Sequence, residues 1–187
     1  KQEITVATAI IPARGGSKRV PDKNILNIAG LPLIAYSIMQ AWRSDQINEV
    51  IVSTNDDKIA AIAAKYGAEI AWRPDELAND IATSESAILH ALDWRRTQNR
   101  SDPEFTVFLQ ATSPVRAKQD IDDAILTFKN QNADSLLSVC DTKRFLWAAN
   151  KSRNSAHSIY YNYKSRKREQ DMDKQFQENG SIYITKT

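Results

Sequence analysis

Four cationic side chains and two adjacent glycines lie within ten residues near the start of this sequence. The cations are Arg14, Lys18, Arg19 and Lys23. Gly15 and Gly16 leave the backbone free to turn its N–H groups toward an anion, and Ser17 adds a hydroxyl donor. These are the groups that bind polyphosphate oxygens. The glycine spacing fits neither a Walker loop nor a dinucleotide fingerprint, and a solvated basic turn is the alternative interpretation.

A loop of this kind needs rigid elements on both sides, and apolar runs alternate with helical periodicity from residue 4 to residue 140. We predict strands at 4–11, 49–53, 68–72, 105–109, 135–140 and, after the turn dipeptide Asn179-Gly180, 181–185. We predict four helices. The first begins at Pro32, the second follows the capping residues Asn55 and Asp56, the third begins at Thr83 or Ser84, and the fourth lies around 121–128. This alternation is typical of a doubly wound α/β fold with a mostly parallel sheet. Ligands of such sheets bind beyond the carboxyl ends of the strands, where the cationic loop lies.

Composition narrows the function classes. The chain has 187 residues, enough for a single domain over 1–187, and its formal charge of only +2 argues against bulk nucleic-acid binding. No apolar run approaches the length of a membrane span. A single cysteine, Cys140, excludes a disulfide framework and is expected to be buried at the end of an apolar run. We expect a cytoplasmic protein, with an irregular polar arm at residues 141–178.

Four segments then occur in a specific order. They are Ile11-Pro-Ala-Arg-Gly-Gly-Ser-Lys-Arg-Val-Pro-Asp-Lys-Asn24, Arg73-Pro-Asp-Glu-Leu77 with Asp80 to Ser84, Leu109-Gln-Ala-Thr-Ser-Pro114 with Arg116, and Glu178-Asn-Gly-Ser-Ile-Tyr-Ile184. Together they resemble the signature of the CMP-sialic acid synthetases, or N-acylneuraminate cytidylyltransferases, over residues 4–187. CMP-Kdo synthetases and other sugar nucleotidyltransferases share part of the first segment. The resemblance implies a Rossmann-like nucleotidyltransferase.

The resemblance also implies a reaction. The anomeric hydroxyl of a nonulosonic acid attacks the α-phosphate of CTP, normally with Mg²⁺, and pyrophosphate leaves. No covalent enzyme intermediate is implied, so the protein must position reactants and neutralise charge.

Roles follow by the same resemblance. The residues implied to bind the triphosphate are Arg14, Gly15, Gly16, Ser17, Lys18 and Lys23. Of these, Arg14, Lys18 and Lys23 are the catalytic candidates, with Lys23 at the α-phosphate. The residues implied to bind cytosine and ribose are Asn24, Arg73, Ala82 and Ser84, and those implied to bind the acceptor sugar are Gln110, Arg168 and Gln170.

Three departures from the family pattern matter. Ala111 stands where the family usually has proline, and the run at 168–173 matches the family weakly, so Arg166 is an alternative to Arg168 for the sugar carboxylate. The family's metal carboxylates belong to a C-terminal segment that this chain, ending at Thr187, would lack, so the chain is either truncated or incomplete at its metal site. We assign no metal ligand, and read the acidic run around Asp171 as solvated.

Several alternatives stay open. The acceptor could be N-acetylneuraminate, legionaminate or pseudaminate, or another keto-acid sugar as in CMP-Kdo synthetases. The family resemblance implies a homodimer, with residues 141–178 as a dimerisation or sugar-site insertion. From a different class, the basic run at 164–168 could belong to a non-catalytic nucleotide- or RNA-binding module, although we do not expect an RNA reader's aromatic stacking platform there.

Overall fold

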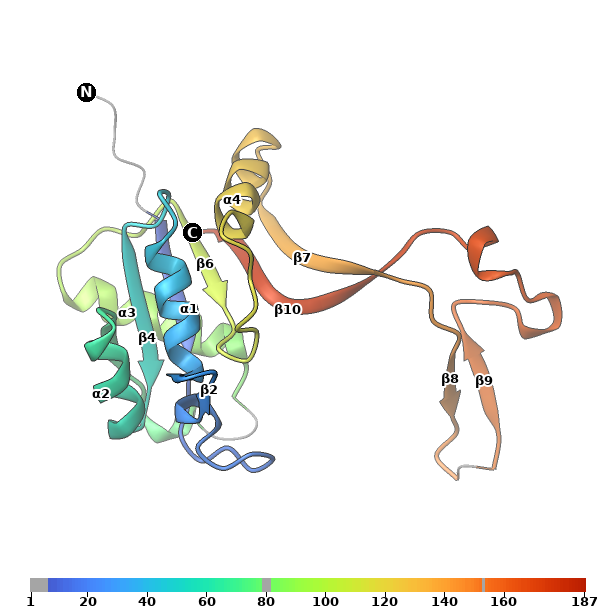
Figure 1. Cartoon of the computed structure of the whole chain (residues 1–187), viewed down its shortest axis with the longest axis horizontal. Coiled ribbons are helices and arrows are strands. Elements are labelled where there is room, and N and C mark those ends of the chain that lie inside the picture. Colours follow the sequence, from blue (N-terminus) through green and yellow to red (C-terminus); the bar gives the residue numbers. More distant parts are fainter. Residues whose placement is uncertain (1–6, 79–81, 153) are drawn as a thin grey trace. The chain divides into compact units, whose positions relative to one another are not determined.

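A six-stranded sheet forms the centre of the fold in the computed structural model, which describes residues 7–78, 82–152 and 154–187 (Figure 1). The strand order is β5-β4-β1-β6-β10-β7. These strands are β1 (Ala7–Pro12), β4 (Glu49–Thr54), β5 (Glu69–Trp72), β6 (Phe105–Leu109), β7 (Ser135–Thr142) and β10 (Gln175–Lys186). The pairs from β5 to β6 are parallel, and β10 runs antiparallel to β6. This confirms the predicted mostly parallel sheet, although residues 4–6 of the first predicted strand lie outside the described residues.

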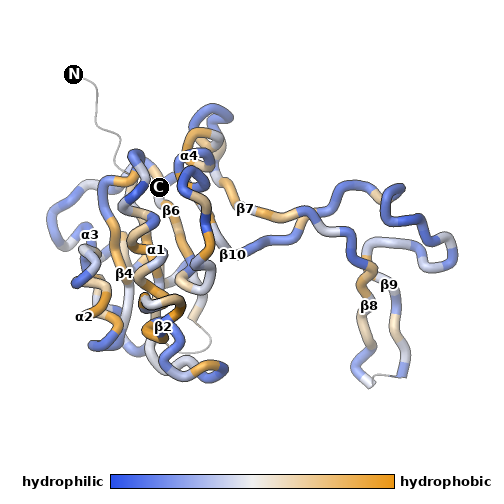
Figure 2. The backbone as a smooth tube through the Cα atoms, in the orientation of Figure 1, coloured by the Kyte–Doolittle hydropathy of each residue, from blue (hydrophilic) through white to orange (hydrophobic). Residues whose placement is uncertain are grey.

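Helices cover both faces of the sheet. They are α1 (Leu33–Trp42), α2 (Asp57–Lys65), α3 (Ser84–Thr97) and α4 (Asp120–Asn130). One core cluster joins α1, α2 and α4 to alternate strand residues such as Ile11 and Val52, and a second joins α3 to Ile10 and Ile51 on the opposite face. Figure 2 shows the hydrophobic residues concentrated along β4 and β6. Burial on both faces is the physical reason for near-continuous apolar strands, and it defines the doubly wound class.

The predicted helix boundaries have visible local causes. Asp56 caps α2, since its carboxylate accepts a hydrogen bond from the Ile59 N–H at 2.9 Å. Thr83 does the same for α3 through the Ser86 N–H at 3.2 Å. Gly67 follows α2 with a φ of +86°, a left-handed conformation that ends helices and costs glycine little.

Short elements connect these larger ones. They are the 3₁₀ turns η1 (Lys23–Ile25) and η2 (Asp75–Leu77) and the two-residue strands β2 (Asn27–Ile28) and β3 (Leu31–Pro32). In the described part of the chain, no helix is both long and apolar enough to cross a membrane.

The chain divides into two compact units, one of residues 1–138 with 180–187 and one of residues 139–179. The second unit contains the antiparallel hairpin of β8 (Leu146–Ala149) and β9 (Ala156–Ile159), followed by the 3₁₀ turns η3 (Tyr163–Ser165) and η4 (Glu169–Asp171). The arm expected to be irregular therefore has regular structure of its own.

Aromatic contacts within the second unit explain this difference. Tyr161 packs edge-on against Phe145 at 5.0 Å between ring centroids and against Trp147 at 6.1 Å, and the Arg166 guanidinium lies 3.7 Å from the centre of the Phe145 ring. The many charged residues around these rings hide the pattern in the sequence. Cys140 is exposed rather than buried, because β7 is exposed at that point.

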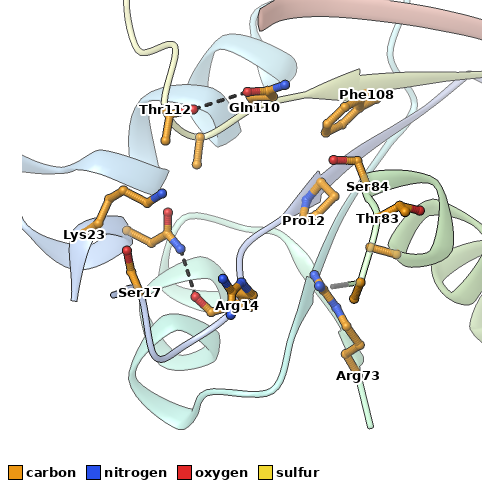
Figure 3. Close-up of a pocket in the computed structure, with 14 residues that line it drawn as sticks. Pro12, Arg14, Ser17, Lys23, Arg73, Thr83, Ser84, Phe108, Gln110 and Thr112 are labelled. Carbon is orange, nitrogen blue, oxygen red and sulfur yellow. Dashed lines mark hydrogen bonds between the residues drawn. The ribbon is translucent and has the colours of Figure 1, made fainter. Parts of the chain in front are cut away.

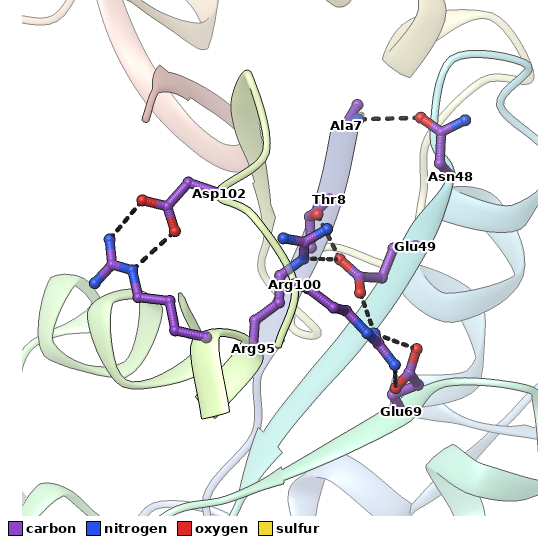
Figure 4. A network of polar contacts seen from close by, with 9 residues as sticks. Ala7, Thr8, Asn48, Glu49, Glu69, Arg95, Arg100 and Asp102 are labelled. Atoms are coloured by element: carbon purple, nitrogen blue, oxygen red, sulfur yellow. Dashed lines mark hydrogen bonds and ion pairs between the residues drawn. The ribbon is translucent and has the colours of Figure 1, made fainter. Parts of the chain in front are cut away.

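At the amino-terminal ends of the strands, a buried carboxylate joins several elements (Figure 4). Glu49 accepts hydrogen bonds from the Thr8 hydroxyl and from Arg95 Nε, both at 2.6 Å, and pairs with Arg100, which also binds Glu69 at 2.8 Å. Burial alone would raise the pKa of Glu49, but the hydrogen bonds from Thr8, Arg95 and Arg100 outweigh it, so the pKa is lowered. This network lies at the opposite end of the strands from the cationic loop.

Candidate active site

A pocket opens at the carboxyl ends of β1 and β6 (Figure 3). Strand β1 lies between β4 and β6, so the chain order reverses here, which is where doubly wound sheets bind ligands. The described residues that line it are Pro12, Arg14, Ser17, Lys23, Asn24, Arg73, Ala82, Thr83, Ser84, Ala87, Phe108, Gln110, Ala111 and Thr112. Three of these are cationic and none is a carboxylate. Such a lining favours an anionic ligand.

The glycine pair gives the loop after β1 its shape. Gly15 approaches the next helix so closely that an added Cβ would lie 2.8 Å from Asp56 Oδ2, and Gly16 has a φ of +66°. The Gly15 N–H donates to Asn55 Oδ1 at 3.0 Å. That N–H is therefore engaged inside the protein, and the binding of an anion by N–H groups of this glycine pair stays a prediction.

Two partly buried hydrogen bonds hold the same loop in place. Asn24 is buried, and its amide donates to the Arg14 carbonyl at 3.1 Å. Arg14 Nη1 donates to the Ala78 carbonyl at 3.3 Å, which joins the loop to the segment after β5. Lys23 begins η1, and Figure 3 shows its ammonium directed toward the interior of the pocket. Among the described residues, no carboxylate lies within ion-pair distance of Lys23, so its charge is available to a ligand.

Arg73 supplies the most deeply buried charge of the pocket. Its Nε donates to Ser53 Oγ at 3.1 Å, Nη2 to the Ser53 carbonyl at 2.6 Å and Nη1 to the Leu77 carbonyl at 3.5 Å. Burial, with repulsion from Arg14, lowers its pKa to about 10, so it stays cationic at neutral pH. Within the described residues no acid neutralises it. A buried, unpaired guanidinium with N–H groups to spare favours binding of an anion or of carbonyl oxygens.

Gln110 forms the opposite corner of the pocket, just beyond β6. Thr112 Oγ1 donates to Gln110 Oε1 at 3.4 Å. Gly180, on β10, has a φ of +67° and so little space that an added Cβ would lie 3.2 Å from Gln110 Oε1. Ser113 Oγ donates to the Gly180 carbonyl at 2.8 Å, which holds the strand against this corner. Gly180 of the N-G dipeptide thus has a defined place beside the Gln110 side chain.

The structure brings together most of the residues predicted from the sequence. Those that line the pocket are Arg14, Ser17, Lys23, Asn24, Arg73, Ala82, Ser84 and Gln110. Gly15, Gly16 and Lys18 lie on the same loop without lining the pocket. Arg168 and Gln170 belong to the other unit, where Arg168 Nε pairs with Asp171 at 2.6 Å.

Sequence reasoning missed several lining residues. They are Pro12, Thr83, Ala87, Phe108, Ala111 and Thr112. Phe108 was detectable, because it shares a face of β6 with Gln110 two residues on and lies at the carboxyl end of the predicted strand. Its ring is stacked on Tyr183 of β10 at 5.3 Å between centroids, a contact that depends on the antiparallel register.

The described residues offer no ready protein site for a metal ion. No group of three or more His, Cys, Asp or Glu side chains there is arranged to hold one. Asp171 is paired with Arg168, and Asp173 is almost fully exposed beside Lys167. We therefore assign no Mg²⁺ ligand among the described residues.

A doubly wound sheet with a cationic pocket at its switch point is typical of α/β domains that bind phosphate-bearing ligands such as nucleotides. The chain belongs to the cytidylyltransferase family, whose family model matches residues 8–185. It is 34% identical over 190 residues to the pseudaminic acid cytidylyltransferase of Campylobacter jejuni (strain 81-176), covering 94% of this chain and 76% of that protein.

A second relative supports the family, and a solved structure supports the fold. The chain is 36% identical over 182 residues to N-acylneuraminate cytidylyltransferase B of Danio rerio, covering 95% of this chain and 41% of that protein. Among solved structures it resembles a CMP:2-keto-3-deoxy-manno-octonic acid synthetase complexed with CTP, with a TM-score of 0.70, 18% identity, and coverage of 97% of this chain and 74% of that chain. This last likeness concerns the fold.

Proposed function

We propose that this cytidylyltransferase transfers CMP from CTP to a nonulosonic acid. The acceptor hydroxyl oxygen bonds to the α-phosphorus of CTP while the bond to pyrophosphate breaks. The observation that carries the proposal is the pocket itself, in which three cations without a lining carboxylate stand opposite the amide of Gln110. The first part suits a triphosphate and the second a polyhydroxylated acceptor. The names of the Campylobacter and zebrafish relatives support the acceptor class.

The cationic wall is assigned to the triphosphate. Arg14, Ser17 and Lys23 line the pocket, and Lys18 extends the charge along the same loop. Lys23 is proposed to stabilise the negative charge that develops at the α-phosphate, because its ammonium points inward and has no described carboxylate partner. Positioned cations of this kind supply most of the catalysis in phosphoryl-type transfers.

The base and ribose are assigned to the wall formed by Asn24, Arg73, Ala82 and Ser84. The Asn24 amide N–H already binds the Arg14 carbonyl, which leaves its oxygen as an acceptor for the cytosine amino group. Arg73 makes three hydrogen bonds inside the protein and has five N–H donors, so two remain for the acceptor atoms of cytosine.

The acceptor is assigned to Gln110, with Arg168 and Gln170 as candidates from the 139–179 unit for its carboxylate and hydroxyls. We also propose that this unit forms a homodimer. Large apolar side chains on it are exposed, including Trp147 at 50%, Tyr163 at 53% and Phe176 at 58%. The rings of Trp147 and Tyr163 lie 5.5 Å apart between centroids, and adjoining exposed apolar groups are typical of interfaces.

Mg²⁺ is proposed to enter with the nucleotide. This ion commonly keeps several waters and binds substrate phosphates together with one or two carboxylates, so a dedicated protein cage is not required. The prediction is loss of turnover with EDTA and its recovery with added Mg²⁺.

The direct test incubates the protein with CTP and, separately, N-acetylneuraminate, legionaminate and pseudaminate. Pyrophosphate release and CMP-sugar formation with at least one of the acids are expected. GTP and ATP in place of CTP are the controls. Turnover with no acid of the panel, although CTP still raises the melting temperature, would contradict the acceptor assignment while leaving the nucleotide assignment standing.

A further inference from the structure

Arg116 is a buried guanidinium at the meeting point of α1, β10 and the segment that follows β6. Only 8% of it is exposed. Its Nη1 donates to Ser37 Oγ at 3.1 Å and to Gln40 Oε1 at 2.8 Å, both on α1. Its Nη2 donates to the Gln110 carbonyl at 3.0 Å and to the Ser181 carbonyl of β10 at 2.8 Å. One side chain therefore connects three elements that meet at the acceptor corner.

This arrangement is costly for the fold. No ion pair joins Arg116 to any described residue, and its Nε has no hydrogen-bond partner there. Burial lowers its pKa to about 10, against an opposing pull from Asp120, so the group is still charged at neutral pH. A desolvated charge without an ion pair is expensive, and departures from local optimality of this kind concentrate where function requires them.

The contacts of Arg116 converge on the backbone of Gln110. The Gln110 carbonyl also accepts from Ser37 Oγ at 3.3 Å and from the Ser113 N–H at 3.1 Å, so three donors fix one peptide oxygen. The Arg116 bond to Ser181 holds the residue next to Gly180, whose missing side chain leaves space for the Gln110 amide. The same guanidinium thus fixes both the backbone of Gln110 and the surface behind its side chain.

We propose that Arg116 is a positioning residue for the acceptor step, which sets the direction of the Gln110 side chain without touching either substrate. The proposal rests on the proposed function, since it assigns Gln110 to the acceptor. Arg116 is absent from the residues that line the pocket, and its four hydrogen bonds all end inside the protein. Displacing a binding group by about 1 Å can cost about 100-fold in rate.

The first test compares Arg116→Gln with Arg95→Gln. Arg95 is the matched control because it is a second buried arginine, 5% exposed and with an unpartnered Nη1, and it lies on α3, which packs on the opposite face of the sheet from α1. In Arg116→Gln, kcat/KM for the acceptor is expected to fall about 10- to 100-fold, while the Kd for CTP changes less than 2-fold. Arg95→Gln should lower the melting temperature and leave both constants near the wild-type values. An equal loss of CTP affinity in Arg116→Gln would overturn the proposal.

The second test asks whether Arg116 acts through Gln110. In a Gln110→Ala background, Arg116→Gln should cost little more, because the side chain that it positions is gone. Fully additive losses would overturn the proposal. Ser37→Ala, which removes one contact of the same network, is the milder variant if Arg116→Gln does not fold, and it should show the same split between acceptor and CTP with a smaller loss.

Hydrogen exchange provides a readout that needs no turnover. The Ser113 N–H is expected to be protected in the wild-type protein, and Arg116→Gln should increase its exchange while Arg95→Gln should not. Unchanged protection at Ser113 in Arg116→Gln would refute the positioning role. If the wild-type protein forms no CMP-sugar, the proposed function fails, and the exchange data still decide whether Arg116 orders the Gln110 segment.

Discussion

Replacing Arg73 by alanine is expected to weaken CTP binding about 100-fold. Three of the five guanidinium N–H groups are occupied by Ser53 Oγ, the Ser53 carbonyl and the Leu77 carbonyl, which leaves two for the nucleotide. A hydrogen bond from a charged donor contributes about 1.5 kcal/mol. Two such bonds give about 3 kcal/mol, which corresponds to about 100-fold in Kd.

Isothermal titration with CTP measures this loss, and two further variants sharpen it. Arg73→Lys keeps the charge but not the planar set of donors, so its Kd should lie between those of wild type and Arg73→Ala. Arg43→Ala removes an exposed cation at the end of α1 and should change the Kd less than 2-fold. Because Arg73→Ala removes one of the two donors to the Ser53 carbonyl and leaves only the Ala13 N–H, titrations belong well below the melting temperature of the variant. A Kd for Arg73→Ala within 2-fold of wild type would refute the assignment.

Three other substitutions test the roles of Lys23, Gly180 and Glu49. Lys23→Ala should lower kcat about 100-fold or more and change CTP affinity much less; steady-state kinetics with the reverse pattern would refute its role at the α-phosphate. Gly180→Ala should cost about 1 kcal/mol in urea unfolding and lower acceptor turnover, because the new Cβ meets Gln110; unchanged turnover would speak against that corner. Glu49→Gln should cost about 3 kcal/mol at pH 7. Because the pKa of Glu49 is lowered by folding, wild type should lose this stability as the pH falls below about 4.3, and the variant should not.

The features that the sequence predicted well are those with a local cause. Asp56 and Thr83 were recognisable as caps because a short polar side chain precedes a periodic apolar pattern. Gly67 marked the end of α2 for a similar reason. The cationic loop could be located because the apolar run before it predicts a strand, which puts the loop at the carboxyl end of that strand. In the structure this strand, β1, pairs with β6, so the loop lies beside the end of β6.

The features that escaped sequence reasoning depend on contacts between distant segments. The Gly15 N–H is bound by Asn55, forty residues away, and nothing in the glycine pair itself indicates this. The buried position of Arg116 depends on α1 and β10 meeting behind the Gln110 loop. The stacking of Phe108 on Tyr183 depends on the antiparallel pairing of β10 with β6.

The 139–179 unit shows the same limit. Its composition is polar and charged, which favoured an irregular arm. The hairpin of β8 and β9 and the contacts of Phe145 and Trp147 with Tyr161 give it order that charge counting does not reveal. The change in composition after Cys140 indicated a separate segment at residues 141–178, and contact clustering of the structure separates residues 139–179.

The pocket at the carboxyl ends of β1 and β6 is proposed to join CMP to a nonulosonic acid. The most direct measurement is mass spectrometric detection of the CMP-sugar together with stoichiometric pyrophosphate, using CTP, Mg²⁺ and each of the three acids with the wild-type protein and with Lys23→Ala. We expect equal amounts of both products with at least one acid, and a large loss in the variant. Pyrophosphate without a CMP-sugar, or equal product formation by Lys23→Ala, would contradict it.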